Sequence, residues 1–319
     1  MLKLKINKTT AANAQAHHDL VAPLIKDRIN SILRKGSIGR GKNLSRVNTT
    51  VSNYLNGLLQ GTALKDIICA LPQDLRIIGA ATDHLYPSFK KKKTADHKVI
   101  ENLFITSVYN GGFNKLDFIK KIDLDTCAYC NRSYIYHLSG NGKRPIKPQI
   151  DHFLPKAKYP YLGLSFYNLI PSCAVCNSPD AKGEYDPVGK EFKSPYEIAD
   201  TDDFVFSYKA DDIAILSPVA RKYAVTVQFK KKIDENTTVL KLEPLYQQHS
   251  DHVLELIIKS KGRYAQAYRK YLESYKAFRF DDLEIDRMIL GNYAGKEELH
   301  KRPLAKLYQD IGRELKLIK

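Results

Sequence analysis

Four of the five cysteines in this chain stand in two short pairs, Cys127 with Cys130 and Cys173 with Cys176. Zinc prefers four thiolate or imidazole ligands in a tetrahedron, and a two-residue spacer lets one tight turn present two thiolates to the same ion. Two such pairs complete the ligand set of a closed site, which suits this spacing better than disulfides do. The spacing therefore predicts one structural Zn²⁺.

Between the two pairs lies the dipeptide Asp151-His152, which has groups that phosphodiester hydrolysis needs. Hydrolysis takes a base that removes a proton from water and a cation that stabilises charge on the phosphate and the leaving oxygen. A neutral histidine, with an unperturbed pKa of about 6.5, accepts a proton near neutral pH. We therefore expect His152 to be the general base and Asp151, a hard oxygen donor, to be a ligand of Mg²⁺ or Mn²⁺.

The elements that would position these residues are short. Residues 144–151 predict a strand that ends at the dipeptide, 154–166 a loop rich in proline and tyrosine, and 167–170 a second strand. Cys173 is expected to open a short helix. The 42 residues between the cysteine pairs are more than zinc fingers usually have, so this stretch must carry structure of its own.

Taken in order along the chain, these residues resemble the motif of the HNH endonucleases, which are ββα-metal nucleases with a treble-clef zinc site. The resemblance covers roughly residues 126–182 and includes a central asparagine, Asn168, and another asparagine, Asn177, directly after the last cysteine. It implies that Asn177 is the second ligand of the divalent ion and that Asn168 bonds backbone across the loop and holds the histidine in place. From the residue type alone, Asn177 could also cap a helix or a turn.

The string from Asp151 to Lys156, Asp-His-Phe-Leu-Pro-Lys, is similar to the dyad of HNH nucleases found in bacterial anti-phage systems such as Septu. That similarity implies a separate ATPase or sensor subunit that licenses cutting.

Three lysines near the motif are candidates for phosphate contacts, although lysines are more often simply solvated. They are Lys156, Lys158 and Lys182.

The charge of the chain favours a polyanionic partner. The 319 residues include 51 Lys and Arg against 35 Asp and Glu, a formal net charge of +16, and a surplus of this size is typical of nucleic-acid-binding proteins. Residues 1–126 hold 20 basic and 10 acidic side chains, so they are the expected clamp. Within them, a basic loop at 34–46 and a run of four lysines at 90–93 are candidates for phosphate contacts.

Length and hydrophobic pattern predict three segments: a basic, mainly helical region at 1–120, the motif region at 121–200, and short strands followed by helices at 201–319. Apolar residues recur at helical spacing in 17–33, 51–59 and 97–109, whereas 204–206 and 224–229 alternate as strands. A long helix is expected over 242–278 and further helix over 284–317. Cys69 is expected to lie in the core.

No apolar run reaches the roughly 20 residues that span a bilayer, and the first residues lack an apolar signal core. We therefore expect a cytoplasmic protein that does not contact membranes, and reduced thiolates suit that compartment.

Four tyrosines of the late helix follow one another at spacings of four, three and four: Tyr264, Tyr268, Tyr271 and Tyr275. This spacing places them on one helix face. A core stripe is the favoured interpretation, and a stacking or partner surface is the alternative.

The sequence thus favours an α+β protein in which a small zinc-braced ββα-metal core lies between mostly helical regions, and which acts as a metal-dependent DNA endonuclease. Two alternatives stay open. One is a non-catalytic zinc-containing nucleic-acid-binding module, in which the Asp-His dipeptide is incidental. The other is an HNH nuclease that cleaves RNA, because both polymers can be hydrolysed with the same base and cation.

Overall fold

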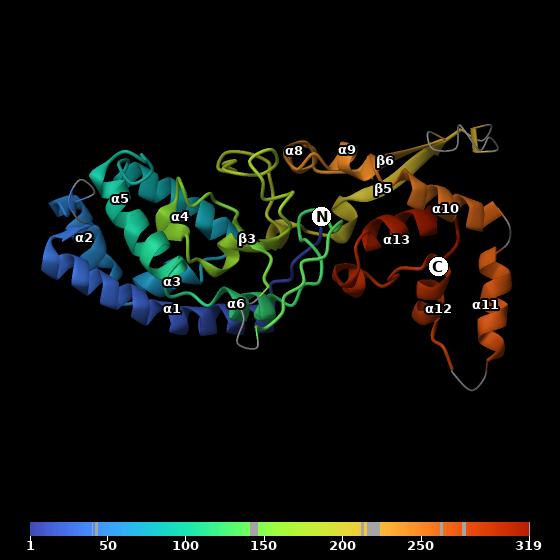
Figure 1. The fold of residues 1–319 in the computed structure, drawn as a ribbon, viewed down its shortest axis with the longest axis horizontal. Coiled ribbons are helices and arrows are strands. Elements are labelled where there is room, and N and C mark those ends of the chain that lie inside the picture. Colours follow the sequence, from blue (N-terminus) through green and yellow to red (C-terminus); the bar gives the residue numbers. More distant parts are fainter. Residues whose placement is uncertain are drawn as a thin grey trace. The chain divides into compact units, whose positions relative to one another are not determined.

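A computed structural model of the chain describes residues 1–39, 41, 44–140, 146–211, 214–215, 224–261, 264–275 and 279–318. These residues form many helices and three two-stranded antiparallel sheets (Figure 1). The expected α+β class is confirmed. Of the basic loop at 34–46, residues 40, 42 and 43 lie outside the described part of the chain.

The described residues group into two compact units. The amino-terminal unit comprises Leu4–Asp123 and His137–Glu197, and the carboxy-terminal unit comprises Met1–Lys3, Leu124–Tyr136 and Ile198–Lys319. The segments expected from the sequence divide the chain by composition and motif, whereas these units group residues that pack together.

The amino-terminal unit is mostly helical and contains two of the sheets. Its helices and strands are α1 (Lys8–Lys35), β1 (Ser37–Ile38), β2 (Ser45–Arg46), α2 (Thr49–Leu58), α3 (Ala63–Ile68), α4 (Pro72–Leu85), α5 (Ala95–Glu101), the π-helical η2 (Asn102–Tyr109), α6 (Lys115–Ile122), β3 (Gln149–His152), η3 (Pro160–Leu162), η4 (Phe166–Asn168), β4 (Leu169–Ser172) and η5 (Pro195–Glu197).

The longest helix, α1, has clear start and stop signals. The Asn7 side chain accepts from the Thr10 backbone N–H, and the Thr10 hydroxyl accepts in return from the Asn7 backbone N–H, which forms a capping box. Gly36 ends the helix at φ 63, a left-handed conformation that glycine adopts without strain. Apolar side chains at helical spacing, including Val21, Ile25 and Ile29, are buried against the rest of the unit.

His17 is a buried polar residue on the same face of α1. Its Nε2 lies 2.8 Å from the carbonyl oxygen of Leu164, and its ring packs against Phe113, Phe118 and Phe166 with centroids 5.2–5.8 Å apart. A carbonyl oxygen only accepts, so Nε2 donates in this hydrogen bond. Burial lowers the pKa of His17 from 6.5 to about 4, because the aromatic surroundings disfavour the charged ring more than the hydrogen bond favours it.

The helix expected to open at Cys173 is not formed, which corrects the ββα arrangement derived from the sequence. Backbone bonds such as Asn177 N to Cys173 O (3.2 Å) and Lys182 N to Cys176 O (3.2 Å) instead hold successive turns. Pro179 explains the difference, since proline has no N–H to continue a helix and disfavours helical φ/ψ in the residue before it.

The carboxy-terminal unit combines one hairpin with helices. Its helices and strands are η6 (Thr201–Asp203), β5 (Val205–Ala210), β6 (Val225–Lys231), α8 (Asp234–Val239), α9 (Leu242–Gln247), α10 (Ser250–Lys261), α11 (Tyr264–Ser274), α12 (Asp282–Leu290), η8 (Lys296–Lys301) and α13 (Ala305–Glu314). The single helix expected over 242–278 is therefore three helices, and its last three residues lie outside the described part of the chain.

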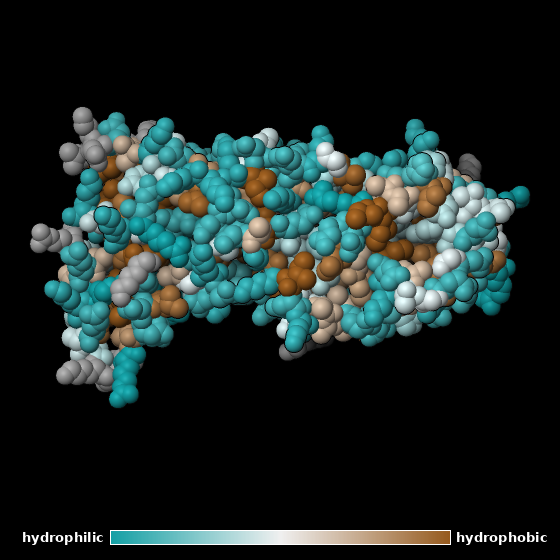
Figure 2. Space-filling model, turned by 180° about the vertical axis from the view of Figure 1, so that it is seen from behind, coloured by the Kyte–Doolittle hydropathy of each residue, from teal (hydrophilic) through white to brown (hydrophobic). Residues whose placement is uncertain are grey.

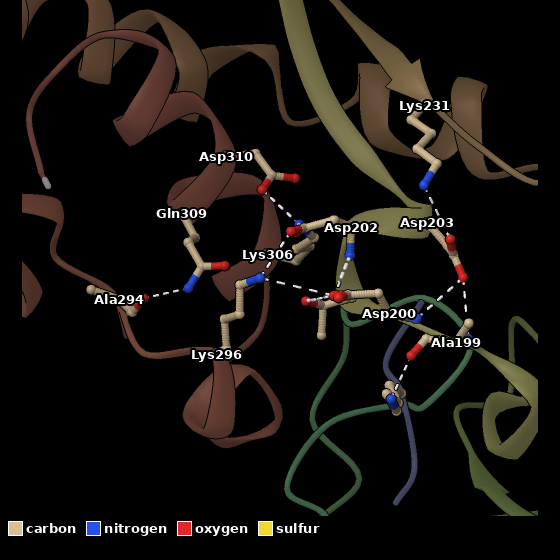
Figure 3. Close-up of polar contacts among 12 residues, drawn as sticks. Ala199, Asp200, Asp202, Asp203, Lys231, Ala294, Lys296, Lys306, Gln309 and Asp310 are labelled. Carbon is tan, nitrogen blue, oxygen red and sulfur yellow. Dashed lines mark hydrogen bonds and ion pairs between the residues drawn. The ribbon is translucent and has the colours of Figure 1, made fainter.

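A network of charged side chains joins α13 to the segment before β5 (Figure 3). Lys306 is fully buried, and its Nζ lies 2.7 Å from Asp310 Oδ1 and 3.3 Å from Asp202 Oδ1. Asp310 also accepts from the Phe206 backbone N–H at 2.9 Å, which ties α13 to β5. Lys296 reaches Asp202 at 2.8 Å, but both of those side chains are 46% exposed. The same aspartate thus has one buried and one exposed lysine partner.

Hydrophilic residues cover most of the face shown in Figure 2, and hydrophobic residues form separate patches between them. Within the described part of the chain, no helix is long and apolar enough to cross a membrane.

The two lysines that contact Asp202 make a matched pair for a stability experiment. Lys306→Met is expected to lower the free energy of unfolding by about 3–5 kcal/mol, because it leaves the buried Asp310 carboxylate without its cation. Lys296→Met is expected to cost less than about 1 kcal/mol, since the exposed pair is screened by water. Urea unfolding of the two variants measures this difference, and equal losses would contradict it.

His17 is expected to make the protein less stable in acid. Its pKa is about 4 in the folded state and about 6.5 when unfolded, so the unfolded chain binds more protons between these values. Stability is therefore fully present above about pH 6.5 and falls as pH drops towards 4, by about 3 kcal/mol from this residue. His17→Gln should flatten the pH dependence of unfolding by that amount. An unchanged slope in the variant would contradict the assignment.

Candidate active site

The hairpin of β3 and β4 positions the Asp-His dipeptide. The strands are antiparallel, with Asp151 opposite Ile170 and His152 opposite Leu169. Side chains alternate between the faces of a strand. Gln149 and Asp151 therefore share one face of β3, and His152 points to the other.

His152 is held by the loop that connects the two strands. The side chain is buried, and its Nε2 lies 3.0 Å from the carbonyl oxygen of Gly163. Because a carbonyl oxygen only accepts, Nε2 carries the hydrogen, and Nδ1 of the neutral ring has the lone pair. Burial lowers the pKa of His152 to about 3, and the positive charges of Lys156, Lys182 and Lys115 lower it further. The ring is therefore neutral near pH 7, and the same environment makes it a weaker base than a solvated imidazole.

The loop around Gly163, whose carbonyl oxygen accepts from His152, is closely packed. A Cβ at this position would lie 2.1 Å from the Ile105 side chain and 3.0 Å from the Pro160 carbonyl oxygen. Nothing in the sequence distinguishes Gly163 from the other glycines, so sequence reasoning does not single it out.

Asn168 fixes the same loop through three hydrogen bonds. Its Oδ1 accepts from the Leu154 backbone N–H at 2.7 Å, and its Nδ2 donates to the carbonyl oxygens of Leu154 (3.2 Å) and Leu162 (2.9 Å). Leu162 directly precedes Gly163, whose carbonyl orients His152. The fully buried amide thus determines where that carbonyl lies.

Asp151 is buried on the other face of β3 and forms an ion pair with Lys182. The Lys182 ammonium lies 3.0 Å from Asp151 Oδ2 and 3.2 Å from Oδ1, and it donates to the His152 carbonyl oxygen at 2.8 Å. The Lys182 side chain is 0% exposed. This lysine was expected at the surface as a phosphate contact, but the turns that replace the expected helix direct it inward instead.

Asn177 lies near the same face of β3 as Asp151. Its Nδ2 donates to Gln149 Oε1 at 2.7 Å, and Gln149 shares that face of the strand with Asp151. The Asp151 carboxylate and the amide oxygen of Asn177 are hard donors, the chemistry that Mg²⁺ or Mn²⁺ prefers. Both oxygens of the Asp151 carboxylate, however, already contact the Lys182 ammonium, at 3.0 and 3.2 Å.

Positive charge gathers near His152. Lys115 Nζ lies 4.1 Å and Lys156 Nζ lies 5.4 Å from the ring centroid of Tyr109, which itself packs edge-on against His152 at 4.7 Å. Burial lowers the pKa of Lys115, and the charges of Lys147 and Lys156 add to this effect. Sequence reasoning missed Tyr109 and Lys115, because both precede the motif and lie more than 35 residues before His152.

Lys158 has a different environment from its neighbour Lys156. Its ammonium forms an ion pair with Asp186, and the hydroxyl of Tyr159 donates to the same carboxylate. Lys156 is exposed. Of the three lysines expected to contact phosphate, only Lys156 is therefore exposed and without an acidic partner among the ion pairs of the described residues.

The four paired cysteines come together. All four are buried, and their Sγ atoms lie within 4.8 Å of one another. A zinc ion with Zn–S bonds of about 2.3 Å places its sulfurs about 3.8 Å apart, so this cluster could hold a structural zinc.

Both cysteine pairs are closed by the same kind of backbone hydrogen bond. In one, the Asn131 backbone N–H donates to the Cys127 carbonyl oxygen at 2.8 Å; in the other, the Asn177 backbone N–H donates to the Cys173 carbonyl oxygen at 3.2 Å. Each turn thus closes on the residue that follows its second cysteine. Asn131 has φ 51, a left-handed conformation that asparagine adopts more readily than most residues.

No protein-family model, curated protein or solved structure matches this chain.

Zinc content tests the role of the cysteines. The purified protein is expected to hold about one zinc per chain, and Cys173→Ser should lose most of it together with thermal stability, because the tetrahedral set is then incomplete. Cys69→Ser is the matched control, since the Cys69 thiol contacts the Ala14 carbonyl oxygen and takes no part in the cluster. Elemental analysis and thermal unfolding measure both effects. Unchanged zinc in Cys173→Ser would contradict the assignment.

Proposed function

We propose that this chain is a metal-dependent DNA endonuclease of the HNH type. The observation that supports this most directly is the state of His152. Its Nε2 is engaged by a loop carbonyl whose position is fixed by Asn168, which leaves Nδ1 as a proton acceptor. A base with a fixed orientation is what in-line attack by water on a phosphodiester requires.

In the proposed reaction, His152 Nδ1 takes a proton from a water molecule. The resulting hydroxide forms a bond to phosphorus, the bond from phosphorus to the 3′-oxygen breaks, and the leaving 3′-oxygen takes a proton from solvent. Asn168 is a positioning residue in this scheme, because it acts through the loop and does not touch the reacting atoms.

Asp151 and Asn177 are the proposed ligands of a divalent ion. Such an ion, when bound, neutralises charge on the phosphate and on the leaving oxygen. The Lys182 ammonium compensates the buried Asp151 carboxylate, which would otherwise be costly to keep ionised. Lys182 thus keeps a negatively charged ligand in place inside the protein.

The surface charge supports a polyanionic substrate. Lys156 and Lys115, both beside Tyr109, are the proposed phosphate contacts nearest to His152. The lysine run at 90–93 is less available than expected, since Lys90 pairs with Asp83 and Lys92 with Glu184. Phosphate contacts of this kind make binding depend strongly on salt.

The similarity to anti-phage HNH nucleases adds a biological setting to the proposal. In that setting the chain is the cutting component of a cytoplasmic antiviral system, and an ATPase or sensor subunit licenses cleavage. This part rests on the motif around Asp151 and His152 alone.

One observation favours a second candidate, a zinc-containing module that binds nucleic acid without cutting it. The buried Asp151–Lys182 ion pair is also what a purely structural pair would look like. RNA cleavage is the third candidate, because the proposed base and ligands do not distinguish the two polymers.

Cleavage of supercoiled plasmid by the purified full chain, with Mg²⁺ or Mn²⁺, tests the proposal. His152→Ala is expected to reduce the rate about 10²- to 10⁴-fold, the usual contribution of a general base. His17→Ala is the matched control, because it also removes a buried imidazole whose Nε2 donates to a carbonyl of the same loop. It should stay within about tenfold of the wild-type rate, since it has no part in the proton transfer. Circular dichroism and zinc content establish that both variants are folded.

Equal losses in the two histidine variants would contradict His152 as the base, because they would show a structural effect of the loop. Cleavage of RNA but not plasmid would favour the RNA nuclease. Absence of cleavage on both polymers, together with salt-sensitive binding, would favour the binding module.

A further inference from the structure

Helix α11 (Figure 1) and the residue that follows it carry the four late tyrosines, three of which are exposed. They form a ladder on the surface, which corrects the favoured interpretation of a core stripe. Tyr264, Tyr271 and Tyr275 are 41%, 54% and 41% exposed. The buried face of α11 is a different one and carries Ala265 and Leu272.

The rings of the ladder are ordered relative to one another. Tyr264 and Tyr268 have centroids 5.4 Å apart at 22°, and Tyr268 and Tyr271 have centroids 6.2 Å apart at 16°. Tyr275 stands nearly perpendicular to Tyr271, at 80°, and their hydroxyls share a hydrogen bond. Single exposed aromatic residues are common on protein surfaces, but a row of near-parallel rings is a preformed stacking surface.

The segment of sequence that carries the ladder is rich in basic residues. Residues 259–279 include seven basic side chains and one acidic side chain, a net +6. Lys261, Lys270 and Arg279 are exposed. Arg269, by contrast, pairs with Asp282 and Asp286 of α12 and is committed to holding the two helices together.

We propose that this tyrosine ladder is a binding site for single-stranded nucleic acid. Aromatic rings that stack on bases, combined with cations that contact phosphates, are how proteins bind unpaired strands without sequence preference. A base inside a duplex already has both faces covered by its neighbours, so the rings favour a single strand. The net +6 favours a polyanion over a protein partner, which would not require this surplus of cations.

This proposal goes beyond the endonuclease and does not depend on it. A chain that cuts nothing could still hold an unpaired strand on α11. For this reason the test measures binding and not cleavage.

The test uses the full chain with a fluorescent oligothymidylate of about 20 nucleotides, a length that spans such a site, and a duplex of equal length. Divalent ions are omitted, and a gel establishes that the oligonucleotides stay intact. The wild type should bind the single strand more tightly than the duplex. The double variant Tyr264→Leu, Tyr271→Leu should weaken binding of the single strand at least tenfold, because two stacking rings are lost, and change binding of the duplex less than about twofold.

A second pair of exposed, stacked tyrosines provides the matched control. Tyr134 and Tyr136 are 44% and 54% exposed, with centroids 4.4 Å apart at 19°. The double variant Tyr134→Leu, Tyr136→Leu should leave binding of the single strand unchanged. Lys270→Gln should reduce the slope of the logarithm of the binding constant against the logarithm of the salt concentration by about one. The Tyr264, Tyr271 variant should leave that slope unchanged.

Three results would overturn the proposal: unchanged single-strand binding in the Tyr264, Tyr271 variant, equal loss of single-strand and duplex binding, or the same loss in the Tyr134, Tyr136 control. The first of these would indicate that the ladder serves a protein partner. Because the substituted tyrosines are exposed, circular dichroism and thermal unfolding should match the wild type in each variant.

Discussion

The candidate active site depends on one buried amide. Asn168 bonds the backbone at both Leu154 and Leu162, and so it fixes the loop between β3 and β4 without any regular secondary structure in most of that loop. A buried amide that lost these partners would be costly, so the loop has one favourable arrangement. This arrangement of the loop sets the position of the Gly163 carbonyl. The hydrogen bond to that carbonyl in turn sets the tautomer and the orientation of His152.

Buried charges in both units are compensated by a specific partner. Asp151 has Lys182, and Asp310 has Lys306, with each of these lysine side chains fully buried. Low dielectric strengthens such pairs but makes a missing partner expensive. Each of these buried charges is therefore neutralised by a neighbouring charge of opposite sign. The formal net charge of +16 must consequently be carried at the surface, where it is available to a polyanion.

Local patterns predicted much of the candidate site, and the packing of distant residues explains the rest. The cysteine spacing is visible in the sequence, because it depends on a few neighbouring residues. The two strands were expected at 144–151 and 167–170, and the structure has them at Gln149–His152 and Leu169–Ser172, with residues 144 and 145 outside the described part of the chain. The helix expected at Cys173 does not form, because Pro179 lacks an N–H and restricts the residue before it. Because turns take the place of that helix, Lys182 is buried beside Asp151 and is not at the surface as expected. Tyr109, Lys115 and Gly163 approach His152 only through tertiary packing, which no short motif encodes.

The tyrosines of α11 show why periodicity alone misplaced a surface. Spacings of three and four residues establish that side chains share a helix face, but not which face is buried. Here the helix offers a second apolar edge, Ala265 and Leu272, seven residues apart and both buried. Small and aliphatic residues pack closely without a polar group to satisfy, whereas each tyrosine brings a hydroxyl that needs a partner or water. A stripe made only of tyrosines in a strongly basic segment is thus better suited to an aqueous, anionic surface than to the interior.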